Sequence, residues 1–168
     1  MLETARLFLR PMNESDVDAI FTLRSDAEMM RFIREPQTNR ADVAGWIYLV
    51  SSLWATDKIG LCAVFDKSSN ALIGWCGLWR LRETGETEVG YAIAKSFQKK
   101  GLASEAAEKC LEYGFDELNL EKIVAVARPE NTASCRVMEK IGMNYDGIGR
   151  FYDCDLAHYS ITRENYKK

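Results

Sequence analysis

The sequence lacks the features of a membrane or secreted protein. No run of about 18 consecutive apolar residues occurs in its 168 residues, whereas a membrane-spanning helix needs about 20. The N-terminal segment MLETARLFLR has the pattern of neither a signal peptide nor a transit peptide. We therefore expect a cytoplasmic protein that does not act at a membrane.

Metal-binding and disulfide patterns are also missing. The five cysteines are odd in number and widely spaced, with no C-x-x-C pair, so neither a structural zinc site nor a disulfide framework is predicted. The only histidine, His158, follows Cys154 by four residues, and on a strand both would face one side. No third orienting group accompanies this pair, which disfavours a cysteine nucleophile. We expect reduced thiols and no bound metal.

The charge balance gives no reason to expect a nucleic acid partner. The chain has 22 basic and 25 acidic residues and a formal net charge of −3, whereas nucleic acid binding usually needs a basic surface. Apolar residues make up 47% and charged residues 28%, as in ordinary globular domains. No internal repeat, low-complexity tract or linker divides the sequence. We expect one domain over residues 1–168, with the four tryptophans in its core.

Hydrophobic periodicity divides the chain into strands and helices. Helical spacing of apolar residues predicts helices at 13–26 and 39–55, from the end of the 97–101 loop to about Leu118, and at 131–142. Apolar runs bounded by turn residues predict strands at 5–11, 59–66, 71–81, 87–94, 122–127, 145–153 and 156–164. This order predicts a mixed α/β fold with consecutive antiparallel hairpins in its centre.

The stretch FQKKGLASEA, residues 97–106, joins a strand to a helix through two lysines and a glycine. Gly101 permits a positive φ or a close approach of the backbone. The N–H groups of the first helical turn lack intrahelical acceptors and lie at the positive end of the helix dipole, so they form an anion site. Lys95, Lys99 and Lys100 add positive charge around it. The alternative is a simple turn with solvated lysines, since the glycine patterns of P-loops and dinucleotide-binding loops are missing.

The segment QKKGLA, residues 98–103, fits the [QR]-x-x-G-x-[GA] signature of the GCN5-related N-acetyltransferase (GNAT) superfamily. The flanking TEVGYAIA and PENTASCRVMEKIGM also resemble this family, in particular its RimJ/RimL-like branch of ribosomal-protein-alanine acetyltransferases. The likeness is strongest over residues 86–145. It implies a central, mostly antiparallel sheet of six to seven strands flanked by about four helices. It also implies that the anion is the pyrophosphate of acetyl-coenzyme A (acetyl-CoA).

By this resemblance, three parts of the chain would bind the coenzyme. The pantetheine arm would run along the backbone of Ile93 and Lys95, and Asn131 would anchor it. Asn131 also suits a helix N-cap, a role that would explain it alone. The pyrophosphate would lie in the loop and first helical turn formed by Gln98, Lys99, Lys100, Gly101, Leu102, Ala103 and Ser104.

Acetyl transfer to an amine requires removal of a proton from the amine. Strand alternation over residues 87–94 places Glu88 on the same face as Gly90 and Ala92, which leaves room for a ligand. Gly90 could also mark a bulge. Glu88 is therefore the predicted general base, acting through a water, and the resemblance supports a glutamate on this strand. The alternative is an exposed carboxylate paired with a lysine or arginine, and Glu86 is the second choice of base.

The leaving thiolate must also be stabilised. Many family members carry a tyrosine seven residues after the asparagine that matches Asn131, but here this position is Met138, which cannot donate a proton. The RimJ/RimL-like branch implies Ser134 as a hydrogen-bond donor to the thiolate. Ser134 could instead be a capping or surface hydroxyl, and Tyr152 or a water is the alternative donor.

The predicted function is direct transfer of acetyl from acetyl-CoA to a primary amine, without an acetyl-enzyme intermediate. The resemblance implies a protein N-terminus as acceptor, for example that of a ribosomal protein, and a small-molecule amine is the rival. Arg150, Tyr152 and Asp153 are candidate acceptor contacts or surface residues, and a homodimer is one possible assembly. The alternative function is a catalytically silent coenzyme A-binding sensor or scaffold, which Met138 would permit and Glu88 argues against.

Overall fold

The computed structural model describes residues 1–166. Its helices are α1 (Val17–Ser25), α2 (Ala27–Met30), α3 (Arg40–Thr56), α4 (Leu102–Glu112), α5 (Thr132–Lys140) and α6 (Arg163–Tyr166). Its strands are β1 (Leu2–Glu3), β2 (Leu7–Pro11), β3 (Gly60–Asp66), β4 (Ala71–Arg80), β5 (Thr87–Ile93), β6 (Lys122–Ala127), β7 (Asn144–Phe151) and β8 (Cys154–Thr162). Short 3-10 turns at Glu14–Asp16 and Lys95–Phe97 precede α1 and the loop of residues 98–101, which we call the glycine loop.

The strands of the described residues form one eight-stranded sheet in the order β1-β2-β3-β4-β5-β6-β8-β7. Every neighbouring pair is antiparallel except β5 with β6. The predicted mixed α/β class and mostly antiparallel sheet are confirmed. The sheet exceeds the predicted six to seven strands because the two residues of β1 pair with β2. The four-residue helices α2 and α6 likewise add to the predicted four helices.

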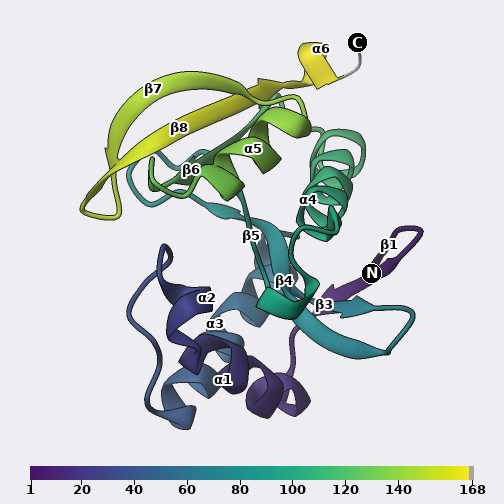
Figure 1. The fold of residues 1–168 in the computed structure, drawn as a ribbon. Coiled ribbons are helices and arrows are strands. Elements are labelled where there is room, and N and C mark those ends of the chain that lie inside the picture. Colours follow the sequence, from purple (N-terminus) through teal and green to yellow (C-terminus); the bar gives the residue numbers. More distant parts are fainter. Residues whose placement is uncertain (167–168) are drawn as a thin grey trace.

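Helices cover both faces of the sheet. The three N-terminal helices lie together in the lower part of Figure 1, apart from α4 and α5. On one face, α4 and α5 pack against alternate strand residues such as Cys76 and Val89. On the other face, α1, α2 and α3 pack against the residues between them, such as Leu61, Trp75 and Ala92. Because both faces are covered, each central strand is an almost continuous apolar run in the sequence.

The parallel pair β5–β6 is joined over a short length only. Its ladder contains a single Cα pair, Glu88 with Val124, and the carboxyl ends of the two strands part beyond it. The edge of β5 that faces away from β4 is therefore open after Glu88. The N–H of Ala94 bonds to β4, so alternation places the N–H and C=O groups of Tyr91 and Ile93 on the open edge.

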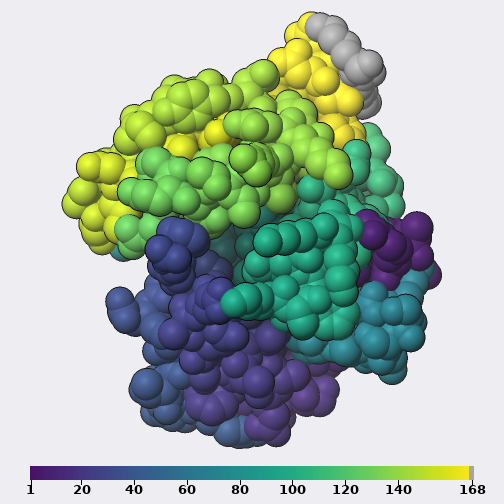
Figure 2. All heavy atoms as spheres, viewed as in Figure 1, coloured from purple at the N-terminus to yellow at the C-terminus, as the bar shows by residue number. Residues whose placement is uncertain are grey.

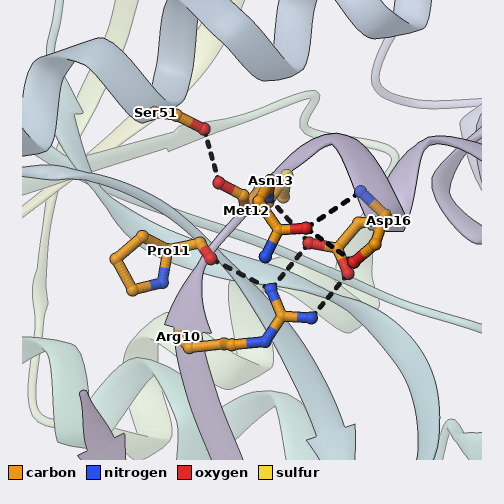
Figure 3. Close-up of polar contacts among 7 residues, drawn as sticks. Arg10, Pro11, Met12, Asn13, Asp16 and Ser51 are labelled. Carbon is orange, nitrogen blue, oxygen red and sulfur yellow. Dashed lines mark hydrogen bonds and ion pairs between the residues drawn. The ribbon is translucent and has the colours of Figure 1, made fainter.

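A largely buried ion pair ties β2 to the helices that follow it (Figure 3). Arg10 Nη1 and Nη2 each donate to one carboxylate oxygen of Asp16 at 2.7 Å, and Asp16 is 3% exposed. Asp16 Oδ2 also accepts the N–H of Asn13 at 2.9 Å, as part of a capping box. Ser51 of α3 donates to the C=O of Met12 at 2.7 Å. These bonds hold the N-terminal helices against the sheet.

The helix predicted to reach about Leu118 ends as α4 at Glu112 and continues as a π-helical turn, Tyr113–Glu117. Within this turn, a Cβ at Gly114 would lie 2.6 Å from Ile123 Cδ1, so the chain approaches β6 closely. Within residues 1–166, no helix combines the length and the apolar character that crossing a membrane requires.

Candidate active site

A cavity of about 200 Å³ lies where β5 and β6 part. Figure 2 shows the surface hollowed where the purple and blue N-terminal helices meet the teal residues of α4 and the green residues of α5. Most of the side chains around the cavity are apolar or aromatic. The cavity is lined by Phe32, Ile33, Trp75, Trp79, Glu88, Val89, Gly90, Tyr91, Ala125, Val126, Ala127, Arg128, Asn131, Ser134, Met138, Tyr152, Cys154 and Leu156.

Glu88 lies in this cavity, and its side chain is buried. The residue is only 3% exposed. Its Oε2 accepts hydrogen bonds from Trp79 Nε1 at 2.6 Å and from the Tyr152 O–H at 2.5 Å. The alternative prediction, an exposed carboxylate paired with a lysine or arginine, is therefore wrong. Tyr152, the alternative donor to the thiolate, instead donates to Glu88.

The surroundings of Glu88 change its acidity. Burial raises the pKa of the carboxyl to about 7, although the hydrogen bonds from Tyr152 and Trp79 act in the opposite direction. The nearby negative charge of Glu83 adds to the increase. A carboxyl with this pKa is partly ionised near neutral pH and can accept a proton there, which suits a general base.

Glu86, the second choice of base, does not line the cavity. Its Oε1 forms an ion pair with Lys122 Nζ at 3.0 Å. The hydrogen bond from Lys122 is the main cause that lowers the pKa of Glu86. Because a carboxylate stabilised in this way binds protons less readily, the geometry favours Glu88 over Glu86.

Gly90 makes room for the side chain of Trp79. A Cβ at Gly90 would lie 3.1 Å from two ring atoms of Trp79. The predicted bulge at Gly90 is wrong, because β4 and β5 pair without a register shift along their whole ladder. The glycine instead allows the indole N–H to reach Glu88. Trp79 therefore lines the cavity, although the sequence predicts a core residue.

Helix α5 contributes Asn131, Ser134 and Met138 to the cavity, and their spacing places them on one helical face. Asn131 is the N-cap, since its Oδ1 accepts the Ser134 N–H at 3.2 Å. The Tyr91 O–H donates to the C=O of Ser134 at 3.0 Å and lies 3.1 Å from Ser134 Oγ. Met138 is 1% exposed and offers no proton. The phenol of Tyr91 thus lies beside Ser134, in the same cavity as Met138, the position at which many family members carry a tyrosine.

The glycine loop has the geometry of an anion site. Gly101 is the N-cap of α4 with a φ of 78°, and Lys99 has a φ of 60°. Within the described part of the chain, no side chain caps α4, so the N–H groups of its first turn are left for a ligand. Leu102 and Ser104 are buried, which restricts their contribution to backbone groups.

Side chains of the loop connect it to the rest of the chain. Gln98 Nε2 donates to the C=O of Ile93 at 2.9 Å and ties the loop to the open edge of β5. Lys100 Nζ lies 4.9 Å from the centre of the Phe97 ring, and Lys95 forms an ion pair with Glu28 of α2. Lys95 and Lys100 thus have partners inside the chain, although the sequence alone predicts only that they add positive charge around the anion site.

Two basic residues near the loop have no signal in the sequence around residues 97–106. A Cβ at Gly101 would lie 3.6 Å from Arg6 Nη2 and 3.8 Å from Lys140 Nζ. Arg6 is held there by an ion pair with Glu105 at 2.6 Å, and its Nη1 donates to the C=O of Lys100 at 2.9 Å. Both come from distant segments, because Arg6 precedes β2 and Lys140 ends α5.

The structure does not bring Cys154 and His158 together as a nucleophile pair. Cys154 Sγ lies 3.7 Å from Arg128 Nη2. His158 Nδ1 lies 3.2 Å from Asp146 Oδ2, and its ring stacks on Phe151. Among residues 1–166, no cluster of three or more His, Cys, Asp or Glu side chains could hold a metal ion.

A protein-family model described as an acetyltransferase (GNAT) domain matches residues 6–144. The chain belongs to this family. Among its relatives, the uncharacterised N-acetyltransferase YnaD of Bacillus subtilis is 32% identical over 173 residues, which cover 98% of each chain. A GNAT-family acetyltransferase from Bacillus anthracis, a solved structure, matches with a TM-score of 0.83 and 30% identity over 97% of this chain and 98% of that chain. The predicted GNAT fold and acyltransferase activity are confirmed.

Enzymes named for different acceptors share this fold. Ribosomal-protein-S5-alanine acetyltransferase from Vibrio fischeri matches with a TM-score of 0.81 and 19% identity, over 99% of this chain and 98% of that chain. Spermidine N-acetyltransferase from Vibrio cholerae, solved with CoA and spermine, matches with a TM-score of 0.80 and 23% identity, over 98% of this chain and 100% of that chain. These two likenesses show the fold alone, so the RimJ/RimL-like branch stays a prediction.

Proposed function

We propose that the protein transfers acetyl from bound acetyl-CoA directly to a primary amine, with Glu88 as the general base. The observation that carries this proposal is the buried Glu88 carboxyl, whose pKa of about 7 suits proton transfer near neutral pH. It lies in a cavity beside the open edge of β5, and Gln98 ties that edge to the anion-binding loop. One strand thus connects the predicted base to the predicted coenzyme site.

The coenzyme would lie along the open edge of β5. Its pyrophosphate would accept hydrogen bonds from the first-turn N–H groups of α4, near the cations of Arg6 and Lys140. The N–H groups of Tyr91 and Ile93 lie on this open edge and would bind the pantetheine arm. The C=O of Ile93 already accepts from Gln98 Nε2. The arm would then deliver the thioester to the cavity where the strands part.

The reaction would need two proton-handling groups. An acceptor that arrives as an ammonium ion would lose a proton to Glu88, directly or through a water, and the free amine would attack the thioester carbonyl. The C–S bond then breaks, and the departing thiolate takes up the second proton of the attacking nitrogen through a water, which leaves the amide and the free thiol of CoA. Ser134, supported by Tyr91, would donate a hydrogen bond to this thiolate, since an aliphatic hydroxyl is too weak an acid to protonate it.

The cavity walls favour an acceptor with a single amine on an apolar body. Phe32, Ile33 and Trp75 supply apolar surface, and Glu88 is the only carboxylate that lines the cavity within residues 1–166. Arg128 adds a positive charge, which disfavours a polycation. We therefore propose a protein N-terminus with an apolar first residue, or a small apolar amine, as the acceptor class.

Acetyl-CoA consumption with mass spectrometry, over a panel of peptides, apolar monoamines and polyamines, tests this function. We expect acetylation of the apolar monoamines or peptides, and a loss of kcat of about 10²- to 10⁴-fold in Glu88→Gln. The matched control Glu86→Gln should keep its turnover. Calorimetry should show equal acetyl-CoA affinity in all three proteins. Acetylation of polyamines alone would refute the acceptor class, and coenzyme binding without any turnover would support the silent module.

A further inference from the structure

The tip of the β7–β8 hairpin is a strained turn that touches the cavity. Tyr152 and Asp153 connect Phe151 to its partner Cys154, with a φ of 50° at Tyr152 and 60° at Asp153. A two-residue hairpin turn with positive φ at both positions favours Asn-Gly, and a bulky aromatic residue is uncommon there. Strain of this kind often occurs at functional sites.

The hairpin tip is held against the turn between β4 and β5. Glu83 Oε1 accepts the backbone N–H of Tyr152 at 2.8 Å. Arg82 Nη2 lies 3.0 Å from the same Glu83 oxygen and 3.2 Å from Asp153 Oδ2. The Tyr152 O–H reaches past this turn and donates to Glu88 Oε2 at 2.5 Å. The backbone and the side chain of Tyr152 are therefore fixed by two different carboxylates.

The two oxygens of Glu88 have different surroundings. Oε2 accepts hydrogen bonds from Tyr152 and Trp79. Oε1 accepts none from residues 1–166, and it is not fully buried, so part of its surface remains accessible. The free oxygen is therefore open to the cavity that Glu88 lines.

We propose that Tyr152 is a positioning residue for the base: it fixes Glu88 Oε2 on the hairpin tip so that Oε1 faces the acceptor amine. This inference rests on the proposed role of Glu88. By donating to the carboxylate, Tyr152 also favours its ionised form, against the effect of burial. Of the titratable and charged groups, Glu83 and Tyr152 act on Glu88 directly, and Tyr91, Arg128 and Cys154 line the same cavity.

Tyr152→Phe removes the hydroxyl and keeps the ring. Loss of a hydrogen bond to a charged group should raise the pKa of Glu88 by about one unit. At pH 7 the ionised fraction of Glu88, and with it kcat/KM, should fall about five-fold, and the loss should disappear near pH 9.5. The affinity for acetyl-CoA should not change, because Tyr152 lies at the hairpin tip and not at the glycine loop.

The pH profile of kcat/KM and a ¹³C NMR titration of labelled glutamate carboxyls test the proposal. Tyr145→Phe is the matched control, because Tyr145 lies on β7 and is 55% exposed. The Glu88 signal is identified by its loss in Glu88→Gln. We expect both the acid limb and the NMR titration to move to higher pH in Tyr152→Phe only.

Two results would overturn the proposal: a loss of activity that is equal at every pH, or a Glu88 titration that does not move. If the unmodified protein acetylates no amine in the panel, the proposed function fails. The NMR titration still decides whether Tyr152 positions and tunes Glu88, because it needs no turnover.

Discussion

Replacing Glu88 by glutamine should make the protein more stable at neutral and alkaline pH, although it removes the proposed base. Burial is the main cause that raises the pKa of this carboxyl from 4.5 to about 7. Each pKa unit corresponds to about 1.4 kcal/mol, so ionising Glu88 costs the folded state up to about 3 kcal/mol relative to the unfolded chain. Glutamine has nearly the same shape, carries no charge and keeps an oxygen for the donors of Trp79 and Tyr152.

The gain should depend on pH in one direction. Between about pH 4.5 and 7, the folded protein keeps a proton on Glu88 that the unfolded chain has released, so the free energy of unfolding falls as the pH rises. Below this window the carboxyl is protonated in both states and costs nothing. The advantage of Glu88→Gln should therefore increase from near zero at the lower limit to about 3 kcal/mol above the upper limit.

Urea denaturation at pH 5, 6, 7 and 8, followed by far-ultraviolet circular dichroism, measures this dependence. Glu86→Gln is the matched control, two residues before Glu88 and just ahead of β5. The pKa of Glu86 is lowered, first by its hydrogen bond from Lys122, so its charge stabilises the folded state above its unfolded pKa. Neutralising Glu86 should therefore reduce stability at pH 8, in the direction opposite to Glu88→Gln.

A difference between Glu88→Gln and the unmodified protein that stays constant from pH 5 to 8 would refute this reasoning. It would mean that Glu88 titrates at its ordinary pKa and that burial imposes no cost on its charge. A variant that is less stable at pH 8 would also contradict it, because the charge of Glu88 would then stabilise the folded protein on balance, with the hydrogen bonds from Trp79 and Tyr152 exceeding the cost of burial.

Three further substitutions test the glycine loop, the basic residue Lys140 beside it, and the ion pair that holds the N-terminal helices against the sheet. Gly101→Ala should cost about 1 kcal/mol in urea denaturation and weaken acetyl-CoA binding in calorimetry, because its φ of 78° is left-handed, although a Cβ would have ordinary contacts. Lys140→Gln should raise the Kd for acetyl-CoA about two- to five-fold, and by less at high salt. Asp16→Ala should lower the free energy of unfolding by about 3 kcal/mol, since it leaves the Arg10 guanidinium, with 25% of its side chain exposed, without its carboxylate.

Most of the fold could be predicted from the sequence because its central elements carry strong periodic signals. Helix α3, predicted at 39–55, spans Arg40–Thr56, and β6, predicted at 122–127, spans Lys122–Ala127. The two residues of β1 are too few to form an alternating pattern, so their place at the sheet edge depends on pairing with β2. Short elements held by tertiary contacts lie beyond what local patterns indicate.

In the candidate site, too, features with a local sequence pattern could be predicted and features that depend on tertiary contacts could not. The glycine loop and Glu88 could be predicted, because a local motif and strand alternation indicate them. The burial of Glu88 could not, because its hydrogen-bond donors Trp79 and Tyr152 come from β4 and from a distant hairpin. Likewise, strand alternation places Tyr91 on the face opposite to Glu88 but cannot show that its phenol reaches Ser134 on α5.

The register of β4 and β5 keeps the proposed base, Glu88, in the cavity while the same strand offers its backbone to the coenzyme. Trp79 and Glu88 are directly paired in this ladder, so their side chains share one face and the indole reaches the carboxylate. The backbone groups of Tyr91 and Ile93 point along the open edge of the same strand. A slip of one residue would exchange the two faces of β5 and remove Glu88 from the cavity. A bulge at Gly90 would do the same to the residues on one side of it, which explains why an unbroken ladder suits a strand that holds both the base and the coenzyme.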